Sequence, residues 1–209
     1  MHALPRRGFL RISASSFLTL FLASTSSLFF GGCSVFTDIK NWVPVGLAAF
    51  DSVLNLLESA GIINPIAGSA ISQIINVIKA AFSQVVADVQ AYQAITPPPA
   101  GALQKIEDTL QIIVTNFGSF FSSLSITDGP LISLISGLAS IILSTIEGFI
   151  NSIRGTSKTS ARVGVSQVMG VNHKPMTITP KARNKAAFTT EFNALCIQHG
   201  HPEAQIKAA

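Results

Sequence analysis

Apolar residues recur at helical spacing in four segments between residues 44 and 153, and this pattern restricts the fold more than any other feature of the chain. It is clearest at 103–124, where apolar positions advance by alternating steps of three and four residues. These positions are Leu103, Ile106, Leu110, Ile113, Phe117, Phe120 and Leu124. A helix with one apolar face must cover that face, so the four segments predict helices that share a core.

The other three segments are expected to form helices over 44–60, 65–95 and 130–153. In the first helix, the residues expected to face inward are Leu47, Phe50, Leu54 and Leu57. In the second they are Ala67, Ile71, Ile74, Ile78, Ala81, Val85 and Tyr92, and Ile75, Phe82 and Val89 flank them. In the last they are Leu131, Leu134, Ile135, Leu138, Ile142, Ile146, Phe149 and Ile153. Short breaks rich in Gly and Pro separate the helices and favour antiparallel neighbours. We therefore predict an all-α protein in which residues 34–153 form an antiparallel four-helix bundle.

Insertion into a membrane is the alternative for part of this region. Only 11% of the residues are charged, against about 25% in a typical soluble domain. The stretches 109–127 and 129–146 contain no charge and approach the length that crosses a bilayer. Serines nevertheless interrupt the second stretch every few positions, as in an amphipathic helix. This pattern favours the bundle over a bilayer-inserted hairpin.

The C-terminal quarter is basic, with seven Lys and Arg residues and no acid between 154 and 185. Valines at alternate or near-alternate positions favour one or two short extended pieces between 163 and 171. A last helix is expected from Pro180, capped by Thr179, to a stop at Gly200. The sequence thus predicts a basic linker at 154–179 and a short helix with its tail at 180–209, a tail that is partly disordered.

The N-terminus has the parts of an export signal. Three arginines and no acid precede an uncharged apolar stretch at 12–30, and small residues follow it. Positive residues remain on the cytoplasmic side, so the chain after residue 30 is expected to be carried across the membrane.

Two motifs in this region resemble those of exported bacterial proteins. Arg6-Arg7-Gly8-Phe9-Leu10-Arg11 resembles the twin-arginine signal, with Pro5 in place of the usual hydroxyl residue and Arg11 in place of the usual lysine. The residues that carry this resemblance are Arg6, Arg7, Phe9 and Leu10. The resemblance implies export of a protein that is already folded.

Phe30-Gly31-Gly32-Cys33 resembles the lipobox of bacterial lipoproteins, although Phe30 replaces the usual aliphatic residue. This resemblance implies cleavage before Cys33 and a diacylglycerol on its sulfur, and two acyl chains suffice for stable anchoring. The alternatives are an uncleaved membrane anchor over 12–30 and ordinary cleavage without lipid. In each case residues 1–33 form the signal region.

Candidate chemistry is sparse. Cys196, His199 and His201 lie at metal-ligand spacing near the C-terminus, but no second cysteine pair or carboxylate cluster supports a zinc or copper site. Cys196 beside His199 lacks a third group to make it a thiol nucleophile. A disulfide between Cys33 and Cys196 is a further alternative. We predict no catalytic residue, no metal and no cofactor.

These features predict a non-enzymatic, lipid-tethered helical protein of the bacterial cell envelope, on the exocytoplasmic side, that acts in binding or scaffolding. The alternatives are an amphipathic protein that inserts into and perturbs membranes, and a carrier of an apolar ligand. The membrane is the expected partner. The basic tail either binds anionic lipid or an envelope polymer or folds onto the acidic helices, and we expect no nucleic acid.

Overall fold

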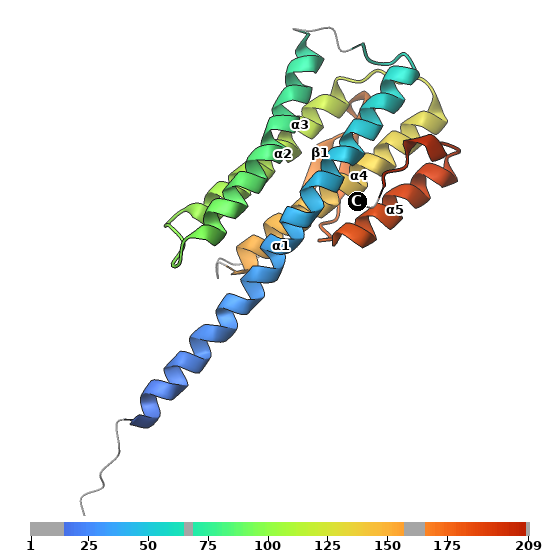
Figure 1. Cartoon of the computed structure of the whole chain (residues 1–209). Coiled ribbons are helices and arrows are strands. Elements are labelled where there is room, and N and C mark those ends of the chain that lie inside the picture. Colours follow the sequence, from blue (N-terminus) through green and yellow to red (C-terminus); the bar gives the residue numbers. More distant parts are fainter. Residues whose placement is uncertain (1–14, 65–68, 157–165, 208–209) are drawn as a thin grey trace, which may run out of the picture.

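The structure is a computed structural model that describes the backbone of residues 15–64, 69–156 and 166–207, and the side chains within 34–64, 69–155 and 167–207. Most of these residues are helical, which confirms the all-α class (Figure 1). The elements in chain order are α1 (Ser15–Ser59), α2 (Ala70–Ala94), α3 (Ala102–Ser122), α4 (Gly129–Thr156), β1 (Ser166–Met169), η1 (Val171–His173), β2 (Pro175–Ile178), α5 (Lys185–Gln198) and η2 (Pro202–Ala204). We call the part of the chain from Ser34 to Lys207 the helical body.

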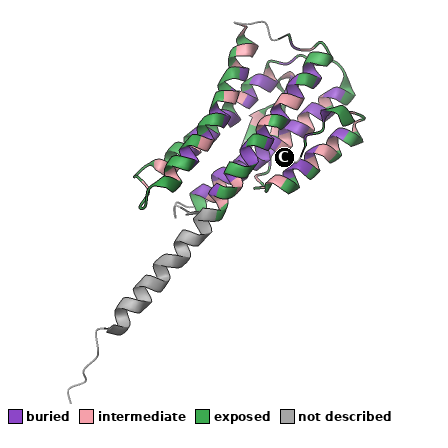
Figure 2. Cartoon of the chain, viewed as in Figure 1, coloured by how far each residue is buried: buried purple, intermediate pink, exposed green. Residues whose placement is uncertain are grey.

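The apolar stripes predicted for α3 and α4 are confirmed. Every predicted inward residue of α3 is buried except Leu103, which is half-buried, and all eight of α4 are buried. The buried side of each helix faces its neighbours in Figure 2. Residues 142–150 of α4 are all buried, so this stretch of the helix is enclosed on every side.

The start predicted for the first helix was wrong, because Pro44 lies inside α1. Proline removes a backbone N–H and clashes with the carbonyl four residues earlier, so a proline usually marks a helix start or a kink. Here the turns before it contribute Phe36, Ile39 and Trp42 to the core, all at most 2% exposed. The burial of these large apolar side chains offsets the cost of the proline.

Helix α2 begins at Ala70, five residues later than predicted, where the Ser69 hydroxyl accepts a hydrogen bond of 3.1 Å from the Ser72 N–H. Its most buried ridge is also rotated from the predicted stripe. The residues expected to flank the stripe, Ile75, Phe82 and Val89, are buried, whereas Ile71, Ile74 and Tyr92 are only half-buried.

The region predicted as a linker contains an antiparallel pair of strands, β1 and β2, with Ser166 opposite Ile178 and Met169 opposite Pro175. Its tip is attached to the loop after α3, where the Asn172 side-chain amide exchanges hydrogen bonds of 2.7 and 3.0 Å with the backbone of Ile126. One short extended piece thus lies in the predicted range, as β1, whereas Val171 begins η1 and the partner strand β2 lies beyond that range. Residues 157–165 lie outside the described residues.

The last helix begins at Lys185 and not at Pro180. Its cap is Asn184, whose side-chain oxygen accepts a 2.9 Å hydrogen bond from the Ala187 N–H. The residues before it run along α4 instead, where the Lys181 N–H donates to the Ser144 carbonyl at 2.8 Å. The predicted stop is confirmed, since α5 ends at Gln198 and Gly200 has a positive φ of 76°.

Four helices meet at Trp42, which is the centre of the core. Its ring centroid lies 5.9 Å from that of Phe82 on α2, 5.5 Å from Phe149 on α4 and 5.5 Å from Phe188 on α5. Gly46 admits the ring, because a Cβ at that position would lie 2.7 Å from the indole. The Trp42 Nε1–H is buried and finds no hydrogen-bond partner among the described residues, a cost that the aromatic contacts offset.

Candidate functional site

The residues of the predicted export signal, Arg6, Arg7, Phe9 and Leu10, lie outside the described residues. The backbone of Cys33 belongs to α1, but its side chain also lies outside the described set. The structure therefore leaves the predicted lipid attachment at Cys33 untested.

The structure does not bring Cys196, His199 and His201 together as a ligand set. Cys196 is a free cysteine with no exposed surface, and burial raises the pKa of its thiol to about 11. His199 caps the C-terminal end of α5, and the His201 ring contacts the Glu203 carboxylate at 2.8 Å. A buried, protonated thiol is a poor nucleophile and a poor metal ligand.

Within the described ranges there is no group of three or more His, Cys, Asp or Glu side chains placed to hold a metal ion. Glu147 is the acid with the most unusual position, since it is 6% exposed and lies in the enclosed part of α4. It forms no ion pair with another described side chain. A single carboxylate of this kind supplies neither an acid–base pair nor a metal site.

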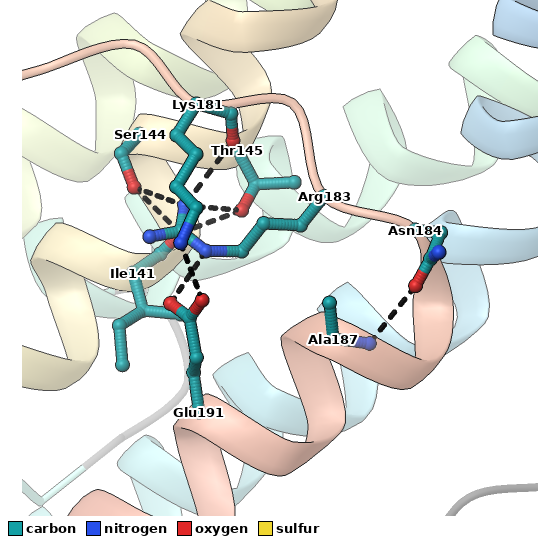
Figure 3. A network of polar contacts seen from close by, with 8 residues as sticks. All are labelled: Ile141, Ser144, Thr145, Lys181, Arg183, Asn184, Ala187 and Glu191. Carbon is teal, nitrogen blue, oxygen red and sulfur yellow. Dashed lines mark hydrogen bonds and ion pairs between the residues drawn. The ribbon is translucent and has the colours of Figure 1, made fainter.

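The most connected polar group joins α4, α5 and the segment between β2 and α5 (Figure 3). We call it the Arg183 cluster, and it consists of Ser144, Thr145, Lys181, Arg183 and Glu191. The Arg183 guanidinium, only 9% exposed, donates to Glu191 at 2.7 Å, to the Ser144 hydroxyl at 2.6 Å and to the Thr145 hydroxyl at 3.1 Å. Lys181 pairs with the same carboxylate at 2.7 Å.

The Arg183 cluster fastens the C-terminal segment to α4. Burial of Glu191 would raise the pKa of its carboxyl, but the hydrogen bonds from Lys181 and Arg183 outweigh this effect and hold the pKa below its ordinary value. Arg154 likewise pairs with Glu107 of α3. Three cations of the basic region thus have partners within the chain. Sequence reasoning missed the cluster, because its groups come from positions far apart in the chain.

A second polar group lies between α2 and α3. Asp88, whose side chain is 2% exposed, accepts from Lys105 at 2.7 Å, from the Gln84 amide at 2.7 Å and from the Thr109 hydroxyl at 2.9 Å. Burial alone would raise the pKa of this carboxyl, but these donors outweigh it and hold the pKa below its ordinary value. The buried charge is therefore compensated.

Next to this group, the turn between α2 and α3 encloses a hollow of about 300 Å³. Its lining is mainly apolar, with Asp88 and Lys105 at one side. The lining residues are Asp88, Ala91, Tyr92, Ile95, Pro99, Ala100, Gly101, Ala102 and Lys105. Ile95 is 52% exposed, which makes it one of the few large apolar side chains that the body leaves open to solvent.

Two helices of the body are long and apolar enough to cross a membrane by length and composition. They are α2, with a window of mean hydropathy 1.4, and α4, with a window of 1.8. A buried core helix passes the same criterion, and 56% of the α4 window is buried in the body. In the α2 window the buried share is 28%.

No protein-family model, curated protein or solved structure matches this chain.

Proposed function

We propose that this chain is a non-enzymatic protein of the bacterial cell envelope, held at the membrane by its N-terminal region, whose helical body acts in binding or scaffolding. The observation that carries the proposal is the order of features along the chain. An arginine-rich start, an apolar stretch and Gly32-Cys33 lead within three residues into Phe36, which is 2% exposed in the core. A signal joined so closely to a folded body suits a protein that stays at the membrane after export.

The packing of the body supports a folded domain on the aqueous side. Its large apolar side chains are buried among themselves, and few described ones are more than about two-fifths exposed: Val77, Ile95, Ile112, Met169 and Ile197. These five positions are distributed over α2, its following turn, α3, β1 and α5. Scattered exposed residues of this kind are normal for a protein in water.

For the arrangement of the helices, we propose an antiparallel four-helix bundle formed by α1 to α4, with α5 packed on it. Contacts between neighbouring helices support this arrangement. Asp51 of α1 pairs with Lys79 of α2, Asp88 of α2 with Lys105 of α3, and Glu107 of α3 with Arg154 of α4. In the first two pairs, residues near the connecting turn meet. In the third, a residue near the start of α3 meets one near the end of α4, and both patterns are those of antiparallel neighbours.

The test is the chemical state of the N-terminus in a bacterial host that has a twin-arginine translocase. Mass spectrometry of the chain purified from membranes should find it starting at an acylated Cys33. Replacing Cys33 by Ala should abolish acylation, and replacing Arg6 and Arg7 together by Lys should leave the precursor inside the cell. A full-length, unprocessed chain that is soluble in the cytoplasm contradicts the proposal.

Membrane insertion is the second candidate function, and it is favoured by the length and hydropathy of α2 and α4. In this case the body would open so that the apolar faces of these helices meet lipid. Limited proteolysis of the chain on vesicles separates the two candidates. Protection of the whole of α4, together with leakage of a vesicle-trapped dye, supports insertion, whereas cleavage equal to that in detergent supports the tethered body.

A further inference from the structure

We propose that the short connection between Cys33 and the body holds the turn between α2 and α3 against the bilayer, with Ile95 and the hollow beside it facing the lipid. This inference rests on the proposed tether. Its occupant is the interfacial layer of the same membrane in which the N-terminal region is anchored. The hollow, the turn and Ile95 together are called the turn surface below.

The length of the connection is the first argument. Phe36 is fixed in the core, and its ring centroid lies 4.5 Å from that of Tyr92 on α2. Only Ser34 and Val35 separate it from Cys33, and the three Cα–Cα steps from Cys33 to Phe36 span at most about 10 Å even when fully extended. The body therefore cannot move far from the membrane, whether Cys33 carries the lipid or 12–30 remains as an anchor.

The direction of the helices is the second argument. Along α1, Trp42 contacts Phe82, and Phe36, nearer to Cys33, contacts Tyr92, which is later in α2. Moving toward Cys33 on α1 thus means moving toward the C-terminal end of α2. Ile95 caps that end, so it lies still nearer to the membrane than Tyr92. Figure 1 agrees, since the turn between α2 and α3 lies at the end of the body from which α1 projects.

The chemistry of the turn surface is the third argument. Its apolar lining includes Ile95, exposed to water at 52%, and the ring of Tyr92, a residue type that favours the interface between headgroups and acyl chains. Pro97, Pro98 and Pro99 have no backbone N–H, so fewer donors lose water when the turn meets lipid. Lys105 is 66% exposed at the rim but keeps its ammonium on the Asp88 carboxylate, so the charge that lines the hollow is paired when the turn meets lipid.

Tryptophan quenching by lipids provides the test, because Trp42 is the only tryptophan and has no exposed surface. The full chain is purified from membranes and reconstituted in vesicles of phosphatidylethanolamine and phosphatidylglycerol, with or without bromine on the acyl chains. Ile95→Trp is compared with Ile197→Trp, which alters an isoleucine on α5 that is exposed to a similar degree, 59% against 52%. Ile197 follows Cys196, whose carbonyl accepts a 2.9 Å hydrogen bond from the His201 N–H, and His201 lies beside Leu56 and Ser59 at the C-terminal end of α1. Flotation of the chain together with the vesicles shows that the tether is present, and circular dichroism confirms that each variant is folded.

Bromine should remove about half of the emission added by Ile95→Trp, because interfacial residues sit 5–10 Å into the boundary with the acyl chains. The wild type and Ile197→Trp should lose little. Equal quenching of the two variants in chains that float overturns the inference and leaves the tether intact. Failure of the wild type to float overturns the tether and the inference together.

A linker variant tests the role of the short connection. About ten Gly and Ser residues inserted after Ser34 add a flexible span of roughly 17 Å. In the Ile95→Trp background, the quenching should then fall toward the wild-type level while flotation is retained. Quenching that is unchanged by the linker contradicts the claim that the connection holds the turn in place.

Discussion

Gly148 of α4 lies against the backbone of Ala182, and a Cβ on this glycine would overlap the Ala182 nitrogen. The segment that carries Arg183 therefore crosses α4 at a point where only a hydrogen atom fits. The close approach lets the Lys181 N–H reach the Ser144 carbonyl at 2.8 Å, one turn earlier in α4. Backbone atoms cannot rotate out of the way as a side-chain end can, so this contact is sensitive to any added atom.

Gly148→Ala should lower the free energy of unfolding by about 1–3 kcal/mol, the usual cost of overpacking a filled core. Gly155→Ala is the matched control on the same helix, because a Cβ there meets no atom of the described residues within 4 Å. The control should be neutral or stabilising by up to about 1 kcal/mol, since alanine favours the helix. Urea denaturation followed by circular dichroism measures both, and equal stabilities would contradict the close approach.

Arg183→Lys should destabilise the body by about 1–3 kcal/mol, because one ammonium cannot replace the guanidinium bonds to Glu191, Ser144 and Thr145 together. Lys181→Met removes a 60% exposed cation that binds the same carboxylate. Its effect should stay below about 0.5 kcal/mol. Thermal unfolding of the two variants provides the comparison. A loss of stability in Lys181→Met as large as that in Arg183→Lys would show that the stabilisation comes from any cation beside Glu191, and not from the buried guanidinium.

The stability of the body should fall in acid partly through Asp88. Its pKa is lower in the folded chain than the ordinary value of 3.8, so below that pH the unfolded chain binds more protons than the folded one. The contribution is full above the ordinary value and is lost as the pH falls through the folded pKa. Asp88→Asn should flatten the acid limb of a plot of unfolding free energy against pH. Asp108→Asn, at an exposed position on α3, is the control, and parallel curves for Asp88→Asn and the wild type would contradict the assignment.

Cys196 should resist thiol reagents until the protein unfolds, because it has no exposed surface and the pKa of its thiol is raised to about 11. In a Cys33→Ser variant, Ellman's reagent at neutral pH should count no thiol in the native protein and one in denaturant. The same pKa shift means that Cys196 contributes to the free energy of unfolding fully below pH 9.0, the ordinary pKa of the thiol. This contribution is lost as the pH rises from 9.0 through the folded pKa of about 11, because the thiol of the unfolded chain ionises first. Rapid reaction of the native variant would place Cys196 at the surface.

The parts of the fold that could be predicted are those whose signal is local. The stripes of α3 and α4 follow from side-chain spacing alone, and residues such as Leu110 and Ile142 are buried as that spacing requires. The turns before Pro44 carry the same spacing in Phe36, Ile39 and Val43. The local rule that a proline marks a helix start hides this spacing, because it is tertiary burial that holds Pro44 inside the helix.

The Arg183 cluster could not be predicted, for a physical reason. Arg183 meets Ser144 and Glu191, which are 39 residues before it and 8 residues after it. No local pattern links these positions, and the loop that brings them together depends on the close approach at Gly148. The same holds for the place of the turn surface beside the start of the body, which follows from the contacts of Phe36 with Tyr92 and of Trp42 with Phe82.

The unbroken burial of residues 142–150 in α4 has a consequence for the dynamics of the protein. No face of this stretch touches solvent. When a single neighbouring helix frays, the other helices therefore still cover the backbone amides of residues 142–150. Their exchange with deuterium should therefore proceed only through complete unfolding of the chain. The slowest-exchanging amides are then expected here, and their protection gives a direct measure of the global free energy under native conditions.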